Sequence, residues 1–393
     1  MNPKTIALLR MALSGQREEL VFDVGEWDQV FADLSEQTVQ AIPSNVVSTL
    51  NLTQQEQDAY VQYCISNLTD FYMALELQSE VQALFREQGI PSVSLKGVSA
   101  AMLYPQPELR CTGDIDLLVL PEDYDRACSI LTEKGFIEEP TELNGRHTGY
   151  RKPGYPLIEL HRYYSSSDNK EQNRILDDML YEGIRNARTL ELEGYEISIL
   201  PPLENGMVLL GHINQHLSSG LGLRQIFDWG MYVQKHLPDE MWTEQFATVA
   251  ESVGMKKLAM VAEALYKKYF CPMEDITWCD AVGDNLKYEL LEYVIASGNF
   301  GCKREYTHRA VLSVIKCFHN PVRFNEFLRR GGISHWKAAR RHPVLRKFVV
   351  FYQIGHLIRA GIRSKVGVSV VKEEGRNSRA IMELMYKLEV TRI

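Results

Sequence analysis

The chain has 393 residues, of which 45% are hydrophobic and 24% are charged, a composition typical of soluble globular proteins with two or three domains. The seven cysteines are scattered singly, which excludes a disulfide-rich framework and leaves reduced thiols as the expected state. No stretch of about 18 apolar residues is present and the N-terminus lacks the apolar core of a signal peptide, so we expect a cytoplasmic protein without a transmembrane segment.

The net charge of −8 hides an uneven distribution of charge along the chain. Residues 300–393 contain 20 Lys and Arg against 6 Asp and Glu, a balance of +14. The first 299 residues contain 23 and 45, a balance of −22. A basic C-terminal region predicts contact with something anionic. The candidates are nucleic acid, an anionic membrane surface, a phosphorylated substrate and the acidic remainder of the chain itself.

Helical periodicity dominates the first part of the chain. Apolar residues recur at helical spacing over 6–13 and 27–34, and a longer helix is predicted from Gln54 to Gln88, where Gly89 ends it. We therefore assign 1–88 as a helical N-terminal region.

The period of the apolar residues changes after Gly89, and strands then alternate with helices. This mixture indicates an α/β core that we place at 89–202, ending at the Pro201-Pro202 pair. Helical periodicity returns from Leu203, which predicts a helical C-terminal domain over 203–393 that includes the basic tail region. Within the core, strands are predicted at 91–95, 114–120, 146–152 and 155–161, a hairpin at 191–200, and helices at 100–104 and 123–134.

The run from Thr112 to Leu120 combines two aspartates with an apolar strand. Asp114 and Asp116 are two residues apart, so on a strand both side chains point to the same face. Two like charges at the start of a buried strand are costly unless a positive group lies between them. A divalent cation held by oxygen ligands is the usual such group, so the pair predicts a metal-dependent enzyme acting on phosphates.

A third carboxylate lies in the apolar strand predicted at 155–161. If this strand neighbours the first, Glu159 joins Asp114 and Asp116 at one edge of the sheet. Three carboxylates there would suit a two-metal mechanism of phosphoryl or nucleotidyl transfer, with Mg²⁺, or Mn²⁺ in its place, as the cofactor. One ion would hold the triphosphate and orient the leaving pyrophosphate. The other would bind the acceptor hydroxyl and lower its pKa.

A turn between a strand and a helix precedes the two aspartates. Lys96, Gly97 and Ser99 lie where backbone N–H groups and a helix N-terminus point toward one place, which favours an anion such as a phosphate. Gly97 lets the backbone approach the phosphate closely, and Lys96 adds a positive charge. Ser99 either caps the helix or donates to a phosphate oxygen.

The order of these motifs resembles the nucleotidyltransferase superfamily built on a palm like that of DNA polymerase β. More closely, the sequence from about residue 6 to residue 233 resembles a bacterial family of uncharacterised nucleotidyltransferases. The motifs that carry this closer resemblance are Leu95-Lys96-Gly97, Tyr104-Pro105, Arg110, Gly113-Asp114-Ile115-Asp116, Gly135-Phe136 and Ile158-Glu159-Leu160-His161.

This resemblance implies an α+β fold: a nucleotidyltransferase-type mixed sheet flanked by helices, a helical N-terminal segment and an all-helical C-terminal domain. It implies Mg²⁺ and a nucleoside triphosphate, with Asp114, Asp116 and Glu159 as catalytic metal ligands. The superfamily generally has Ser or Gly after the glycine of the phosphate turn, whereas this chain has Val98. The backbone amides, Lys96 and Ser99 are therefore expected to hold the terminal phosphate.

Two further residues lie close to the aspartates and Glu159 in sequence. Arg110 precedes Asp114 by four residues and either contacts phosphate with both arms of its guanidinium or pairs with a carboxylate. His161 lies two residues after Glu159 on the same strand face. It is a candidate for orienting a carboxylate, for binding metal or substrate, for acting as a base, or for a purely structural hydrogen bond.

A second polar cluster lies in the helical part of the chain. His212 and His216 are one helical turn apart and share a face, which permits zinc binding, but no third ligand is nearby in sequence. By the family resemblance, His216, Arg224 and Asp228 are candidate contacts to the nucleotide or the acceptor. The alternative is a buried polar network that joins the two domains.

These observations predict an enzyme, a nucleotidyltransferase that moves a nucleoside monophosphate from a nucleoside triphosphate to an unknown hydroxyl or phosphate acceptor. Two alternatives stay open. Val98 in the phosphate turn motivates a non-catalytic module that binds a nucleotide or another anion. The basic C-terminal region motivates a toxin-like enzyme that modifies protein or RNA, with nucleic acid or an anionic membrane surface as its partner.

Overall fold

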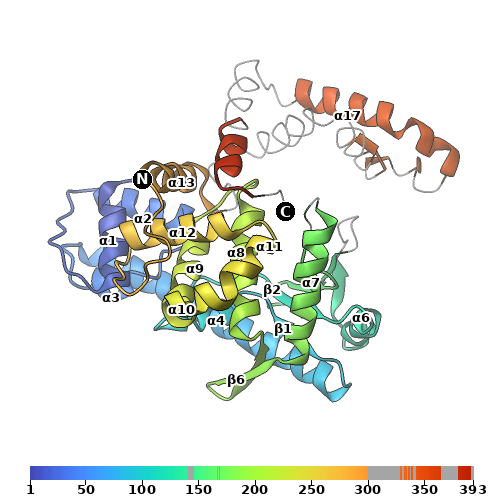
Figure 1. The fold of residues 1–393 in the computed structure, drawn as a ribbon, viewed down its shortest axis with the longest axis horizontal. Helices are drawn as coiled ribbons and strands as arrows, with labels where there is room; N and C mark the ends of the chain where they lie inside the picture. The colour runs from blue at the N-terminus through green and yellow to red at the C-terminus, as the bar shows by residue number, and fades with distance from the viewer. Residues whose placement is uncertain are drawn as a thin grey trace. The chain divides into compact units, whose positions relative to one another are not determined.

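The structure is a computed structural model of the chain (Figure 1). The chain divides into two compact units. The first unit is formed by 1–301 with 387–393, and the second by 302–386. The predicted boundaries near residues 88 and 202 both lie inside the first unit. The residues that the structure describes are 1–139, 146–165, 167, 169–299, 328–329, 332–333, 335–336, 338–339, 342–363 and 379–390.

Four helices open the first unit, in agreement with the predicted helical N-terminal region. They are α1 (Pro3–Ser14), α2 (Glu26–Glu36), α3 (Ser44–Val47) and α4 (Gln54–Glu87). The long α4 begins at a capping box, in which the Thr53 side chain accepts from the Glu56 N–H and the Glu56 carboxylate accepts from the Thr53 N–H. It ends before Gly89, whose φ of +69° suits glycine.

The strands form one mixed seven-stranded sheet in the order β3-β4-β5-β2-β1-β7-β6. The central strand β2 pairs antiparallel with β1 and parallel with β5, and β1 pairs parallel with β7. This confirms the α+β fold and every predicted strand, and it adds β3, which the sequence pattern did not predict. The strands are β1 (Ser92–Ser94), β2 (Ile115–Val119), β3 (Ile137–Glu139), β4 (His147–Arg151), β5 (Ile158–His161), β6 (Arg188–Leu192) and β7 (Tyr195–Ile199).

The two faces of the sheet carry different residues because side chains alternate along each strand. Ile115 and Leu117 of β2 and Ile158 and Leu160 of β5 are at most 2% exposed and belong to one apolar cluster. The residues between them along each strand, which include the polar groups, therefore face the opposite side.

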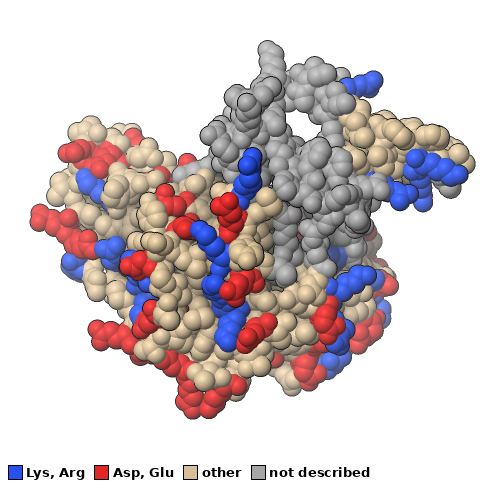
Figure 2. Space-filling model, turned by 45° about the horizontal axis from the view of Figure 1, so that its top comes forward, with Lys and Arg blue, Asp and Glu red and all other residues tan. Residues whose placement is uncertain are grey.

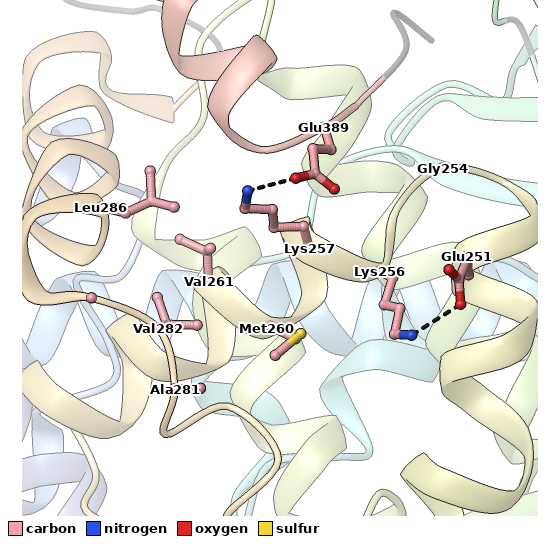
Figure 3. Close-up of a pocket in the computed structure, with 11 residues that line it drawn as sticks. Glu251, Gly254, Lys256, Lys257, Met260, Val261, Ala281, Val282, Leu286 and Glu389 are labelled. Atoms are coloured by element: carbon pink, nitrogen blue, oxygen red, sulfur yellow. Dashed lines mark hydrogen bonds and ion pairs between the residues drawn. The ribbon is translucent and has the colours of Figure 1, made fainter.

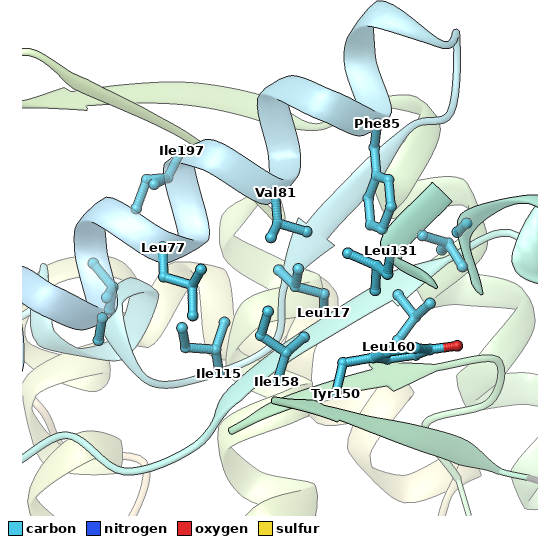
Figure 4. Close-up of a cluster of buried hydrophobic side chains, with 14 of the residues drawn as sticks. Leu77, Val81, Phe85, Ile115, Leu117, Leu131, Tyr150, Ile158, Leu160 and Ile197 are labelled. Atoms are coloured by element: carbon cyan, nitrogen blue, oxygen red, sulfur yellow. The ribbon is translucent and has the colours of Figure 1, made fainter. Parts of the chain in front are cut away.

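Two helices cover the apolar face (Figure 4). Leu77, Val81 and Phe85 of α4 point onto the strands, and Leu131 of α6 (Tyr124–Glu133) packs beside them. Burying each of these side chains contributes about 2 kcal/mol, so this layer holds the sheet rigidly in place. The polar face of the sheet is thereby presented by a fixed framework.

Helices return at Pro202, as the Pro201-Pro202 pair predicts, and they complete the first unit. Helix α7, which the sequence pattern did not predict, packs against β2. Among the described residues of both units, we find no helix whose length and apolar character would let it cross a bilayer. The remaining helices of the first unit are α5 (Val98–Ala101), η1 (Pro107–Leu109), α7 (Lys170–Arg185), α8 (Pro202–His216), α9 (Leu223–His236), α10 (Asp239–Met241), η2 (Trp242–Phe246), α11 (Ala247–Ser252), α12 (Lys256–Tyr269) and α13 (Asp284–Ser297).

The second unit contains η4 (Pro343–Phe348) and α17 (Val349–Arg363). Much of the predicted basic tail, including 300–327 and 364–378, lies outside the described residues. The five cysteines within the described residues are free thiols, as expected, and Cys302 and Cys317 lie outside them.

Candidate active site

Three carboxylates from two parallel strands meet on the polar face of the sheet. Asp116 of β2 lies opposite Glu159 of β5, and Asp114 immediately precedes β2. One oxygen from each of these side chains lies within 4.8 Å of the other two. The structure thus brings together the three carboxylates that the sequence singles out.

Lys96 supplies a positive charge next to two of these carboxylates. Its Nζ lies 3.0 Å from Asp116 Oδ2 and 3.9 Å from Asp114 Oδ2. Burial opposes ionisation of Asp116, which is 1% exposed, but Lys96 and then His161 hold the pKa of its carboxyl below the usual range. The charge of Asp116, followed by burial, raises the pKa of Asp114. The aspartate pair therefore needs a cation, and the Lys96 ammonium meets that need here.

His161 holds two of the carboxylates in place. Its Nε2 lies 2.9 Å from Asp116 Oδ1 and 3.5 Å from Glu159 Oε2. Burial favours the neutral imidazole, but the hydrogen bonds to Asp116 and Glu159 raise the pKa of His161 above its usual value. His161 therefore orients carboxylates, which is one of the roles that its position in the sequence suggests.

The turn after β1 has the backbone shape that requires glycine. Gly97 has φ +66° and precedes the four-residue helix α5. The Ser99 hydroxyl is buried and donates to the Lys96 carbonyl at 3.2 Å, and it makes no capping hydrogen bond to α5. Ser99 therefore stabilises the turn itself.

Arg110 and Asp228 form a buried ion pair behind this turn. Arg110 donates from Nε to Asp228 Oδ1 at 2.7 Å and from Nη2 to Oδ2 at 2.6 Å. The Tyr104 hydroxyl donates to the same carboxylate at 2.9 Å, and Arg110 Nη1 donates to the Gly97 carbonyl at 3.2 Å. Arg110 thus pairs with a carboxylate here, and it also contacts the turn through the Gly97 carbonyl.

The start of the helical segment contains two more predicted residues, and each of them donates to a backbone carbonyl. His216 Nδ1 donates to the Gly220 carbonyl at 3.2 Å, and Arg224 Nη1 donates to the Cys111 carbonyl at 3.1 Å. Burial, then the charges of Lys96 and Arg224, lower the pKa of His216 to about 4.

The zinc alternative for His212 and His216 gains no support. Their ring centroids are 4.5 Å apart in an edge-on contact. Among the described residues, neither histidine belongs to a group of three metal-ligating side chains. Burial, followed by the charge of Lys96, lowers the pKa of His212 well below its usual value, so both imidazoles are neutral.

Sequence reasoning did not identify His147, which lies in the same cluster. It begins β4 and faces His161 across the antiparallel pairing with β5. Its Nε2 lies 3.8 Å from Glu159 Oε1. The strand that contains His147 was predicted. Its register with β5, which brings His147 opposite His161, could not be predicted from the pattern of either strand.

A separate pocket of about 530 Å³ lies between α12 and the start of α13, away from the carboxylates (Figure 3). Its two lysines are already paired: Lys256 with Glu251 at 2.9 Å and Lys257 with Glu389 at 2.6 Å. The apolar part of its wall includes Met260. Because its charges are neutralised internally, we assign no chemistry to this pocket.

Comparison with known proteins places this arrangement among nucleotidyltransferases. A family model described as uncharacterised nucleotidyltransferase matches residues 25–270. Among solved structures, one similar chain is an antigenic nucleotidyltransferase-like protein from Paracoccidioides brasiliensis. It is 15% identical, with a TM-score of 0.32, and the match covers 52% of this chain and 95% of that chain. Among curated proteins, none matches the chain.

Proposed function

The chain belongs to the family of uncharacterised nucleotidyltransferases, and from this premise we propose that it transfers a nucleoside monophosphate from a nucleoside triphosphate to a hydroxyl or phosphate acceptor. One observation carries the proposal: the parallel pairing of Asp116 with Glu159, which gathers three carboxylates within 4.8 Å. Oxygen donors of this kind are the protein ligands that Mg²⁺ prefers. Asp114, Asp116 and Glu159 therefore fit the metal that the family implies.

Each residue of the site has a distinct task in this reaction. The acceptor oxygen attacks the α-phosphorus, and the bond to the pyrophosphate oxygen breaks. Bound at the three carboxylates, Mg²⁺ would supply Lewis-acid stabilisation of the phosphate charge and would lower the pKa of the acceptor hydroxyl. His161 keeps Asp116 and Glu159 in position through its Nε2. Lys96, once another cation neutralises the aspartates, is free to turn its ammonium toward the triphosphate.

The double change Asp114→Asn with Asp116→Asn tests the proposal. It removes two negative charges and keeps the size of both side chains. We expect transfer of label from α-³²P-labelled nucleoside triphosphates to fall by at least about a thousandfold, because metal ligands act directly on the transition state. Each triphosphate is incubated with Mg²⁺, the protein and a cell extract that supplies the acceptor.

The matched control is Asp123→Asn with Asp125→Asn. These aspartates have the same spacing and pair with Arg126 and Arg162 outside the carboxylate cluster. Their replacement should leave transfer unchanged. Undiminished labelling by a folded Asp114/Asp116 double variant would rule the proposal out.

A second candidate function rests on Lys96, whose ammonium lies where a metal ion would neutralise the aspartates. In a non-catalytic module, this lysine would replace the metal permanently. Calorimetry separates the two functions. A nucleotidyltransferase binds the triphosphate more tightly with Mg²⁺ present, and it releases pyrophosphate once a cell extract supplies the acceptor. The module binds equally with and without Mg²⁺ and releases no pyrophosphate under either condition.

A further inference from the structure

A second group of potential metal ligands adjoins the three carboxylates and includes two imidazoles. His147 of β4 lies opposite His161 of β5, and Glu159 is two residues before His161 on the same strand. The two rings have centroids 4.9 Å apart and an interplanar angle of 42°. Both imidazoles therefore lie beside the one carboxylate that also belongs to the acidic cluster.

The distances within this group resemble those between the ligands of one ion. His147 Nε2 lies 3.8 Å from Glu159 Oε1, and His161 Nε2 lies 3.5 Å from Glu159 Oε2. One ligand atom from each residue lies within 4.8 Å of the other two. Two ligands of a tetrahedral zinc ion with bonds of about 2.1 Å are about 3.4 Å apart. Small side-chain movements would thus bring all three atoms onto one ion, and His161 Nε2 would exchange its hydrogen bond to Asp116 for the bond to that ion.

We propose that His147, Glu159 and His161 form a second cation position, one that takes a transition-metal ion such as Zn²⁺ or Co²⁺. Two imidazole nitrogens and one carboxylate are a donor set that suits these ions. The neighbouring position at Asp114, Asp116 and Glu159 offers only oxygen and suits Mg²⁺. The two positions differ in the metal that they select, and Glu159 links them.

The framework and the local charge both favour this second position. All three ligands lie on two hydrogen-bonded strands, so the ladder between β4 and β5 fixes their spacing. His161 is 3% exposed, and the His147 side chain is 13% exposed. The three carboxylates outnumber the single Lys96 ammonium, so a dication bound here while the neighbouring position is empty offsets the local excess of negative charge.

Metal-binding measurements on full-length protein without a histidine tag test this proposal. Zn²⁺ and Mg²⁺ are titrated separately by calorimetry, and Co²⁺ is followed by visible absorbance. We expect one Zn²⁺ or Co²⁺ per chain at this position. His147→Gln should weaken Zn²⁺ binding by more than about tenfold and leave Mg²⁺ binding unchanged. Asp114→Asn should do the reverse.

The matched control is His236→Gln, which removes a histidine of α9 outside the cluster and should change neither affinity. Unchanged Zn²⁺ affinity in His147→Gln would overturn the proposal. So would equal losses of Zn²⁺ in His147→Gln and Asp114→Asn, because they would indicate a single position. A thiolate-to-Co²⁺ charge-transfer band would assign the ion to cysteines and overturn it as well.

A second measurement needs no variant and decides the matter if His147→Gln fails to fold. Electron paramagnetic resonance of the unaltered protein with one equivalent of Cu²⁺ counts the nitrogen ligands. Two nitrogens support the histidine position, and fewer than two overturn it. These binding readouts do not depend on transferase activity, so they stand or fall separately from the proposed reaction.

Discussion

Single residues around the site are held by buried charges that compensate one another. Lys96 and His161 balance the carboxylate of Asp116, and Arg110 balances Asp228 behind the turn that contains Gly97. Each of these groups would be destabilising if it were buried alone, because an unpaired charge loses its hydration. The ion pairs of the site are therefore sensitive to single substitutions.

The Arg110–Asp228 pair gives the first prediction. Asp228→Asn leaves the Arg110 guanidinium, 2% exposed, without a counter-charge. We expect the free energy of unfolding to fall by about 3–5 kcal/mol. Urea unfolding at neutral pH measures the loss. Replacing both partners, Arg110→Met with Asp228→Leu, should restore most of the stability, and a double variant as unstable as Asp228→Asn would contradict this explanation.

His216 gives a prediction about pH. The folded state holds its pKa at about 4, below the value of 6.5 expected for an unfolded chain, so acid favours unfolding. This contribution to stability is complete above pH 6.5 and is lost as the pH falls toward 4. His216→Asn keeps an N–H donor for the Gly220 carbonyl but does not titrate.

Between about pH 7 and pH 5, the wild-type protein should lose about 2 kcal/mol more stability than His216→Asn. Urea unfolding of both proteins at the two pH values measures the difference. Equal losses in the free energy of unfolding of the two proteins would contradict the prediction, because they would mean that His216 binds no extra proton on unfolding.

The helices α8, α9 and α12 pack against one another through glycines. Gly206 of α8 lies against the Tyr232 ring of α9, and a Cβ at Gly206 would lie 2.2 Å from Tyr232 Cζ. Gly230 of α9 similarly faces the Tyr266 ring of α12. Such contacts leave no room for even one methyl group. The close approach of α8 and α9 sets where His216 and Arg224 lie.

Gly206→Ala should therefore destabilise the first unit by at least about 2 kcal/mol, because neither backbone nor the Tyr232 ring can move aside freely. Gly355→Ala is the matched control, since Gly355 is also in a helix but a Cβ added there would meet nothing within 4 Å. It should preserve or raise stability, by up to about 1 kcal/mol. Thermal unfolding followed by circular dichroism compares the two. Equal effects would show that helix propensity, and not packing, decides.

Many of the strands and helices can be predicted from the sequence. Apolar runs predict β2 and β5, and helical spacing with the stop at Gly89 predicts the long α4. The helical spacing of Leu176, Leu180 and Ile184 is the local signal that corresponds to α7. Local patterns do not predict which strands pair or which charged residues form ion pairs, because these pairings join residues that are distant in sequence. Arg110 and Asp228 are 118 residues apart, and no local pattern links them.

The basic excess of the chain lies in the second unit. Residues 302–386 contain 18 Lys and Arg against 5 Asp and Glu. Its described residues 342–363 include Arg346, Lys347 and Arg359 and no acidic residue. Figure 2 colours the basic side chains of the described residues blue and the acidic ones red. Phe348 and Phe351 beside them are 54% and 73% exposed. Basic and apolar groups together are typical of surfaces that bind polyanions or anionic membranes.

In the sequence, the first unit continues on both sides of 302–386, so the second unit can be deleted as one segment. Replacing 302–386 with a flexible Gly-Ser linker should preserve the three carboxylates and remove the basic excess. We expect full-length protein to bind a fluorescent single-stranded RNA with an affinity that falls as salt rises, and the deletion variant to bind at least about tenfold more weakly. Fluorescence anisotropy across a salt series measures both. The alternative is that the basic charges of the second unit neutralise the acidic excess of the first 299 residues. Full-length protein will then bind no RNA, and added salt will lower its unfolding temperature because salt screens this attraction.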